Sequence, residues 1–218
     1  MTPSDSTRHV DGLSIIEALP HLLLLTALFF TTFIARIILA PLLPTIEAEL
    51  AIGHRSAGNL FFILSTGYFL SLLSTSYLAG QLQHRTLIIT STLGMGIVLF
   101  TAPWITTITG LRTIVFQLGL SAGLYLPSGI SAVTHLTRPS HWGRALAIHE
   151  LAPNLAFIIA PVAAELVLHY TSWRLGLAII GSVALLLGLL YTTHGRGTNF
   201  HGQMPDRQAV QHLSLIHI

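Results

Sequence analysis

Six long apolar runs, separated by short breaks, limit what this chain can fold into. They cover approximately residues 20–43, 57–79, 86–103, 108–134, 145–168 and 173–193. A helix needs about 20 apolar residues to cross the hydrocarbon core of a bilayer, and each run is close to that length. Lipid offers no hydrogen-bond partner to a backbone, so only helices and closed barrels span it. Because the runs lack the short alternating pattern of barrel strands, the sequence predicts an all-α, polytopic membrane protein with six transmembrane helices.

The charge content supports a membrane protein and argues against other classes. Only 8% of the 218 residues are charged and 52% are hydrophobic, whereas a soluble domain carries about 25% charged residues. The net charge is only +2, and the ten basic side chains, all arginines, are scattered along the chain. This gives no basic patch for nucleic acid. There is no cysteine for a disulfide or a thiolate metal site, and we expect no metal and no cofactor.

The arginines also predict how the chain threads the membrane, because cytoplasmic loops are enriched in positive charge. With the N-terminus inside, the cytoplasmic side receives six arginines, Arg8, Arg85, Arg138, Arg144, Arg196 and Arg207. The outer loops receive Arg55 and Arg174, together with Glu47 and Glu49. The first run is too long for a signal-peptide core. Residues 1–19 are therefore predicted to be the cytoplasmic tail of a multi-pass protein in the plasma (inner) membrane.

Three charged side chains lie inside the predicted spans at a similar depth. At a rise of 1.5 Å per residue, Arg36 lies about 10 Å from the outer edge, Arg112 about 6 Å and Glu165 about 5 Å. Charges inside a membrane are costly and usually line a cavity or a substrate path. One interpretation is a cluster around an outward-facing cavity. The alternative is that each side chain extends to the lipid headgroups.

The fifth span carries a polar stripe. Glu150, Asn154, Pro161 and Glu165 fall within an arc of about 60° on a helix. Such a stripe is unfavourable against lipid, and we expect it to face the interior of the bundle. The alternatives are a hydrogen-bond seam between helices without a role in transport and, for Glu150, an ion pair with Arg144.

Glycines and prolines in the spans predict close helix contacts and interrupted helices. Gly119 and Gly123 form a G-x-x-x-G pair, which lets two helix backbones approach closely, and Gln117 lies on the opposite, polar face of the same span. Proline kinks or interrupts a helix, and interrupted helices are expected where backbone lines a cavity. The prolines concerned are Pro41, Pro44, Pro127, Pro153 and Pro161.

Two short strings imitate enzyme motifs without the partners that the motifs need. "GLSAG" (119–123) has the G-x-S-x-G form, but no histidine is predicted at the depth of Ser121 on a neighbouring span. "HELAP" begins like the zinc-protease motif H-E-x-x-H, but Pro153 replaces the second histidine. The sequence therefore predicts that the protein is not an enzyme, with an intramembrane protease as a remote alternative.

Several segments together resemble the N-terminal half of a major facilitator superfamily (MFS) transporter, over about residues 20–196. "ARIILAPLLPTI" is similar to the first helix of the family and "LRTIVFQLGLSAGLYLP" to its fourth. "RPSHWGRALAIHELAPNLAFIIAPVAAEL…SWR" is similar to the loop before the fifth helix, the fifth helix and the start of the sixth. "GQLQHR" resembles the loop 2–3 signature of the family, G-x-L-x-D-R. Gly80, Leu82 and Arg85 match this signature, whereas His84 stands where the family has Asp.

The resemblance implies secondary active transport of a small molecule by alternating access between two six-helix halves. Each half consists of two inverted three-helix repeats, whose leading helices, here spans 1 and 4, line the substrate cavity. Arg36 and Arg112 would then lie in the cavity and favour an organic anion, because guanidinium binds carboxylate and phosphate in a fork. Asn154 and Gln117 are candidates for further polar contacts with the substrate.

The carboxylates of the fifth span are candidates for the coupling site of such a carrier. Desolvation favours the protonated form of a carboxyl group, so Glu165, and after it Glu150, is the candidate to carry a coupling proton. Alternatively, either carboxylate neutralises an intramembrane arginine. The implied partners are a small-molecule substrate, the lipid bilayer, protons and a second six-helix half.

The end of the sequence suggests a fragment. Residues 195–212 are polar and resemble the start of the cytoplasmic loop that joins the two halves. Residues 213–218, "LSLIHI", match one reading frame of a common sequencing adapter, and we interpret them as an artefact. The alternative is a complete six-span protein that works as a homodimeric carrier or channel.

Sequencing the source DNA past the codon for His212, from a library prepared without that adapter, tests the fragment interpretation. We expect the reading frame to continue into six further apolar spans. A stop within a few codons that preserves "LSLIHI" would contradict the half-transporter interpretation and favour a six-span protein that acts alone or as a dimer.

Overall fold

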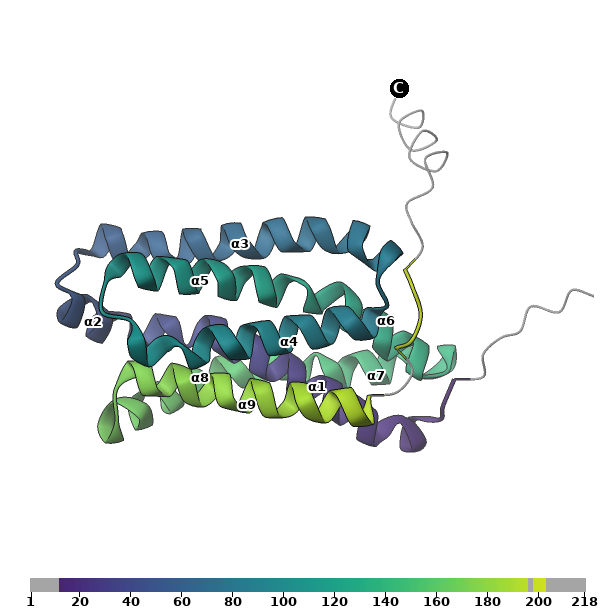
Figure 1. Ribbon diagram of the computed structural model, residues 1–218. Helices are drawn as coiled ribbons and strands as arrows, with labels where there is room; N and C mark the ends of the chain where they lie inside the picture. Colours follow the sequence, from purple (N-terminus) through teal and green to yellow (C-terminus); the bar gives the residue numbers. More distant parts are fainter. Residues whose placement is uncertain (1–11, 196–197, 203–218) are drawn as a thin grey trace, which may run out of the picture.

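The computed structural model describes residues 12–195 and 198–202. Six helical segments in this part of the chain are long and apolar enough to cross a membrane. They are Ile15–Leu50, His54–Gln81, His84–Trp104, Ile108–Leu136, Pro139–Tyr170 and Trp173–His194. They confirm the six predicted spans, and Figure 1 shows them side by side. Outside the described residues lie most of the N-terminal tail and of the 195–212 loop, residues 213–218, Arg8, Arg196 and Arg207.

Each span consists of one continuous helix or of two or three consecutive helices. Helices α3 (His54–Gln81) and α9 (Trp173–His194) are continuous. The first span contains α1 (Ile15–Ile37) and α2 (Leu39–Leu50), and the third contains α4 (His84–Phe100) and the short 3-10 helix η1 (Ala102–Trp104). The fourth contains α5 (Ile108–Gly123) and α6 (Tyr125–Leu136), and the fifth contains η2 (Pro139–His141), α7 (Trp142–His149) and α8 (Leu151–Tyr170).

Three prolines break the first, fourth and fifth spans in the same way. Helix α1 ends at Ile37, α5 at Gly123 and α7 at His149, and four residues later come Pro41, Pro127 and Pro153 respectively. Proline has no N–H to donate to the carbonyl four residues earlier, and its ring clashes with that carbonyl. Each helix therefore ends at that carbonyl, and a new helix begins after a single residue. Pro44 and Pro161 lie within α2 and α8 and do not interrupt them.

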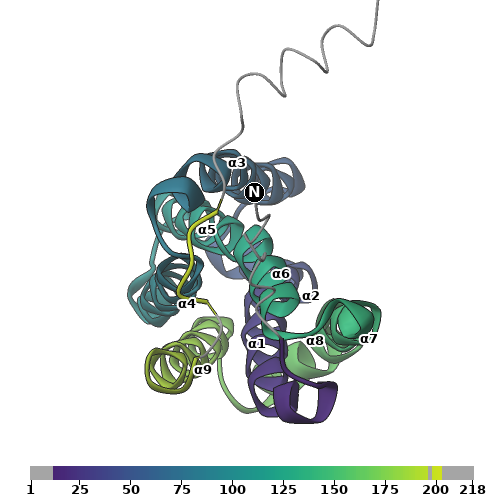
Figure 2. The ribbon, with the colours of Figure 1, turned by 90° about the vertical axis from the view of Figure 1, so that its right-hand side faces the viewer.

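Three helix pairs make the most extensive contacts in the bundle, namely α1 with α8, α3 with α5 and α4 with α9. These pairs join spans 1 and 5, spans 2 and 4, and spans 3 and 6. If span 1 is exchanged with span 4, span 2 with span 5 and span 3 with span 6, the contact between spans 1 and 5 becomes the contact between spans 4 and 2. The contact between spans 3 and 6 stays the same. Figure 2, which looks along the bundle, shows α3 beside α5 and α4 beside α9. The contacts thus have the symmetry of two three-helix repeats. Because each repeat has three spans, the second repeat starts from the opposite side of the membrane, and the two repeats are therefore inverted relative to each other.

Small residues let these helix pairs pack closely. A Cβ atom on Gly119 of α5 would lie 2.8 Å from the Tyr68 amide nitrogen of α3, and one on Gly123 would lie 2.6 Å from the Tyr68 carbonyl oxygen. This confirms the close contact predicted for the G-x-x-x-G pair. Between α4 and α9, a Cβ on Gly96 would lie 2.9 Å from the Gly181 carbonyl oxygen. Helix α8 packs mainly on α1, and its buried residues are four alanines, Ala152, Ala156, Ala160 and Ala164.

The outer surface of the bundle is apolar. Phe62 and Leu73 of α3, Ile158 and Val162 of α8, and Leu186 of α9 are all more than half exposed. A soluble protein rarely exposes so many large apolar side chains together. This surface accounts for the low charge content of the sequence, and it suits contact with lipid or with a second helical unit.

Helix α1 begins at Ile15, before the predicted edge of the first span. Ser14 and Glu17 form a capping box, in which the Glu17 N–H donates to the Ser14 hydroxyl at 3.5 Å and the Ser14 N–H donates to the Glu17 carboxylate at 2.9 Å. These reciprocal bonds satisfy two amides that a helix start leaves free. The Leu13 N–H donates to the Leu136 carbonyl at 3.0 Å, which joins the start of the first span to the end of the fourth.

Gly119→Ala should destabilise the bundle. The new Cβ would overlap the Leu64 carbonyl oxygen of α3, and overpacking of this kind costs about 1–3 kcal/mol. We expect a lower Tm for the purified protein in detergent. Gly58→Ala is the matched control, because no atom lies within 4 Å of its Cβ position and alanine favours a helix more than glycine does. An equal fall in Tm for both variants would contradict the close-contact interpretation.

Candidate functional site

A hollow of about 370 Å³ lies beside the break in the first span. Its walls come from α1, α2, α3 and α8, and most of them are apolar. The residues that line it are Phe33, Arg36, Ile37, Ala40, Pro41, Phe61, Leu64, Phe157, Ala160 and Pro161. Among these described residues, only Arg36 is charged. We call this space the Arg36 hollow.

Arg36 is partly buried, and its guanidinium group lies over two aromatic rings. The guanidinium carbon lies 4.8 Å from the ring centroid of Phe33 and 4.5 Å from that of Tyr68, and Nε donates to the Thr32 carbonyl at 3.4 Å. None of the ion pairs between described residues includes Arg36. Ring faces attract a cation, but they do not neutralise its charge. The arginine therefore presents a positive charge to an otherwise apolar space.

Two prolines add polar backbone to the same walls. Pro41 cannot donate a hydrogen bond to the carbonyl of Ile37, and Pro161 cannot donate one to the carbonyl of Phe157. All four residues line the Arg36 hollow. Backbone that is not fully paired is tolerated at membrane depth where it borders a cavity. The break in the first span thus explains why a cavity can form at this point.

The second predicted arginine, Arg112, lies in a different place. It lines a hollow of about 580 Å³ with Arg55, Ser56, Gly58, Asn59 and Phe62. Phe61 and Leu64, which border the Arg36 hollow, lie on another face of α3. Glu165 is exposed, and no ion pair between described residues joins it to either arginine. The prediction that the three intramembrane charges share one cavity is therefore wrong for this bundle.

The polar stripe of the fifth span is not buried in the bundle either. Glu150, Asn154, Pro161 and Glu165 are all exposed, and the expectation that they face the bundle interior is wrong. The alanine face of α8 occupies the contact with α1 instead, because small side chains allow a closer approach of the two backbones. Asn154 donates to the Glu150 carbonyl of its own span at 2.8 Å. Gln117 of α5 is exposed as well.

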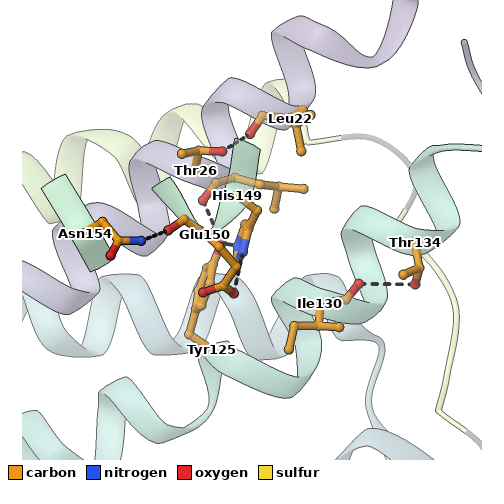
Figure 3. A network of polar contacts seen from close by, with 9 residues as sticks. Leu22, Thr26, Tyr125, Ile130, Thr134, His149, Glu150 and Asn154 are labelled. Atoms are coloured by element: carbon orange, nitrogen blue, oxygen red, sulfur yellow. Dashed lines mark hydrogen bonds and ion pairs between the residues drawn. The ribbon is translucent and has the colours of Figure 1, made fainter. Parts of the chain in front are cut away.

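A partly buried polar cluster lies where the breaks of the fourth and fifth spans meet the first span, as Figure 3 shows. Tyr125, the first residue of α6, donates to the Leu25 carbonyl of α1 at 2.7 Å. The Nε2 atom of His149, the last residue of α7, lies 3.3 Å from the same hydroxyl oxygen. The His149 ring stacks on Phe29 with 4.5 Å between centroids, and its Nδ1 lies 3.6 Å from the Glu150 carboxylate. We call Tyr125, His149 and Glu150 the His149 cluster.

Two alternatives that the sequence left open concern residues of this cluster. Among the described residues, the ion-pair partner of Glu150 is His149 and not Arg144. Ser121 of the "GLSAG" string lies against Gly94 of α4, where a Cβ would be 3.1 Å from the serine hydroxyl, whereas Nε2 of His149 is bonded within its cluster. The serine–histidine pair of a protease is therefore not assembled from these residues.

Comparison with known families agrees with this architecture. The family model described as Major Facilitator Superfamily matches residues 25–212, which is most of the chain. The chain belongs to the major facilitator superfamily. This confirms the resemblance that the motifs indicated, and it points to a transporter.

Solved transporter structures share the MFS arrangement of the six spans. A bacterial homolog of the human lysosomal transporter Spinster, inward-facing and unoccupied, gives a TM-score of 0.76 at 14% identity, over 88% of this chain and 46% of that chain. A peptide transporter, POT, gives 0.75 at 15% identity, over 95% and 46%. A POT family transporter in complex with a thioalcohol-conjugated peptide gives 0.74 at 13% identity, over 92% and 44%. These likenesses show the fold, and this chain spans about half the length of the structures it matches.

The residues that resemble the MFS loop 2–3 signature lie at the junction of α3 and α4. His84, at the aspartate position of the family, is buried, and its Nδ1 lies 3.2 Å from the Ser128 hydroxyl of α6. Its backbone N–H donates to the Phe200 carbonyl at 3.0 Å. Arg85 donates to the Thr192 carbonyl of α9. In this MFS member the signature thus joins the third span to the fourth and to the segment after the sixth.

The other two signature residues lie at the end of α3. Gly80 is partly buried, and Leu82 is exposed while its backbone N–H donates to the Leu78 carbonyl at 2.7 Å. The Gly202 N–H donates to the Ala79 carbonyl at 2.6 Å. The segment after α9 therefore lies alongside both helices that the signature connects.

The residues around Arg36 and His149 were only partly visible in the sequence. Phe33 lies three residues before Arg36, a spacing that places both side chains on one side of a helix. Tyr68 belongs to another span, and no spacing rule connects it with Arg36. Similarly, the sequence shows His149 beside Glu150, but the contact with Tyr125 depends on how two broken spans pack.

His84→Ala should destabilise this end of the MFS bundle. It removes a buried hydrogen bond to Ser128, and leaving a buried polar group without its partner costs about 1–3 kcal/mol. His84→Asn is the matched control, because its side-chain amide can still reach the serine hydroxyl. We expect thermal unfolding in detergent to show a lower Tm for the alanine variant and a smaller change for the asparagine variant. Wild-type Tm values in both would show that the bond contributes little to stability.

Proposed function

We propose that this chain is one half of a secondary active transporter that moves a small organic anion by alternating access. Its six spans and its membership of the MFS identify a multi-pass membrane protein of a transporter family. The nature of the substrate is the further step, and the Arg36 hollow supports it.

The positive charge of Arg36 is the observation on which the proposal rests. A charge withdrawn from water without a counter-ion is costly, and here two ring faces supply only part of the compensation. An anionic group in the hollow would complete it. Guanidinium binds carboxylate, sulfonate or phosphate oxygens through charge-assisted hydrogen bonds, which are stronger than neutral ones.

The remaining walls suggest what the anion carries with it. Phe33, Phe61 and Phe157 surround the space, and its volume of about 370 Å³ falls in the range typical of small-molecule sites. Apolar walls with one fixed charge suit a ligand with a compact apolar body and a single anionic end. We therefore propose an amphipathic organic anion as the substrate class.

We further propose that a second six-helix unit completes the site. The chain spans about half the length of the transporter structures it matches. The exposed polar residues of α8 and α5, among them Asn154, Gln117 and Glu165, are unfavourable against lipid and would contact that unit, as would the hollow at Arg112. The unit is the missing half of a longer carrier or, in the alternative, a second copy of this chain.

The arginine distribution supports a cytoplasmic N-terminus and the plasma (inner) membrane. Arg85, Arg138 and Arg144 belong to the end of the bundle where α1 begins, whereas Arg55 and Arg174 belong to the opposite end, as the helix order in Figure 1 shows. Positive residues concentrate on the cytoplasmic side of a membrane protein, so the first of these ends faces the cytoplasm.

Arg36→Gln should weaken the binding of benzenesulfonate to the full chain. The lost charge-assisted hydrogen bonds contribute about 1.5–3 kcal/mol, which corresponds to roughly a 10- to 150-fold loss of affinity. Isothermal titration calorimetry of the purified protein measures this change. Benzenesulfonamide, the neutral molecule of the same shape, should bind the wild type weakly and should bind the variant equally weakly.

Arg144→Gln is the matched control, because it removes the same charge from an exposed position on α7 and should leave the affinity unchanged. Arg112→Gln, measured in parallel, decides whether the second predicted arginine contributes. Equal benzenesulfonate affinities in the wild type and Arg36→Gln would contradict the proposed anion site.

A further inference from the structure

The positions of the protons in the His149 cluster follow from its geometry. The Tyr125 hydroxyl has one proton, which it donates to the Leu25 carbonyl at 2.7 Å. Its oxygen can therefore only accept a hydrogen bond from Nε2 of His149, 3.3 Å away, so Nε2 carries a proton. In a neutral imidazole the other nitrogen, Nδ1, then holds a lone pair.

That lone pair faces a second acceptor. Nδ1 is buried without a hydrogen-bond partner among the described residues, and it lies 3.6 Å from a carboxylate oxygen of Glu150. Two acceptors that face each other repel, and an unsatisfied buried polar atom is costly. One additional proton, held by either residue, converts this contact into a charge-assisted hydrogen bond. His149 and Glu150 therefore have the geometry of a pair that binds one proton between them.

Burial differs between the two residues in a way that suits proton uptake. The His149 side chain is fully buried, whereas the Glu150 side chain is 51% exposed. Figure 3 shows the Glu150 carboxylate beside the imidazole ring, at the edge of the cluster. A proton from outside the bundle can thus reach the buried imidazole through the carboxylate.

We propose that His149 and Glu150 form a proton-binding site that takes up the coupling proton of the transporter. The pair carries one negative charge without the proton and is neutral overall with it. This inference rests on the proposed transport function. It assigns the coupling role to Glu150 together with His149, and not to Glu165, which lies farther along α8.

The elements around His149 leave few groups that can influence its charge. Helix α1 contributes Phe29 and the Leu25 carbonyl, α6 contributes Tyr125, and the break before α8 contributes Glu150. Among the described residues, Tyr125 and Glu150 are therefore the titratable groups in contact with the imidazole. No arginine forms an ion pair with either residue of the site in this part of the chain.

The location of the site gives proton binding a structural consequence. Glu150 is the single residue between α7 and α8, and Tyr125 directly follows the break between α5 and α6. A change of charge here acts on two helix breaks and on α1 at the same time. A ligand shifts a conformational equilibrium only if it interacts differently with the two states, and helix breaks are places where two states of a bundle can differ.

Nuclear magnetic resonance of the full chain, labelled with nitrogen-15 histidine in lipid nanodiscs, tests the proton-binding site. His149→Gln identifies the His149 signals. We expect Nε2 to be protonated at high pH and Nδ1 to gain a proton as the pH falls. Glu150→Gln should weaken this proton binding at least about tenfold, a shift of one pH unit. It removes the negative charge, and its amide N–H can satisfy Nδ1 permanently.

Glu165→Gln is the matched control, because it removes a carboxylate from the same helix away from the cluster and should leave the His149 titration unchanged. The signals of the other histidines show whether each variant is folded. The proposal is overturned if His149 titrates at the same pH in Glu150→Gln as in the wild type, or if Nδ1 and not Nε2 is protonated at high pH.

Proteoliposomes that contain the pH-sensitive dye pyranine test the coupling. Benzenesulfonate stays ionised and cannot itself carry protons across lipid, so proton movement during its uptake reports coupling by the protein. We expect this movement in the wild type and its loss in Glu150→Gln, and equal movement in both would overturn the assignment. If the wild type moves no benzenesulfonate even with a second six-helix unit in the same liposomes, the transport proposal fails, while the histidine titration still decides whether the proton site exists.

Discussion

Backbone hydrogen bonding in a medium without water is the constraint on which this structure depends. A carbonyl that loses its donor inside a bilayer finds no water, so it must lie against protein or border a cavity. Three prolines create such carbonyls, at Ile37, Gly123 and His149, and a helix ends at each of them. One of these breaks borders the Arg36 hollow, and the other two meet in the His149 cluster. The places where the helices cannot continue are therefore also the places where the candidate chemistry lies.

Helix packing in this bundle depends on how closely the backbones of two helices approach each other. Lipid tails are as apolar as leucine, so burying large apolar side chains between helices brings little gain, and backbone proximity matters more. Gly119 and Gly123 bring α5 onto α3, and the alanines of α8 bring it onto α1. This choice of contact faces has a functional result. It leaves the polar stripe of α8 exposed, where we propose that a second helical unit packs.

The molecule compensates its charges in three different ways. At one end of the bundle, Glu49 forms an ion pair with Arg174 and accepts a hydrogen bond from the Trp173 indole at 2.6 Å, so both charges are neutralised within the chain. Among the described residues, two ring faces and a backbone carbonyl contact the Arg36 guanidinium and no carboxylate pairs with it, and we propose that a ligand supplies the missing negative charge. His149 and Glu150 share a site that one proton satisfies. We propose ligands for Arg36 and for the His149–Glu150 pair because neither is fully compensated among the described residues.

The sequence by itself determined the number of spans, their all-α character, the places where three of them break and the family. Length, hydropathy and the backbone chemistry of proline are local properties, and each follows from a few neighbouring residues. Depth in the membrane is also local, which is why Arg36, Arg112 and Glu165 could be placed at one level. Only the tertiary structure decided which way each side chain points, because rotation about a helix axis depends on the partner helix. For that reason Arg36 contacts Tyr68 and lines a different hollow from Arg112. The alanines of α8, and not its polar stripe, pack on α1. His149 contacts Tyr125, although each belongs to a different broken span.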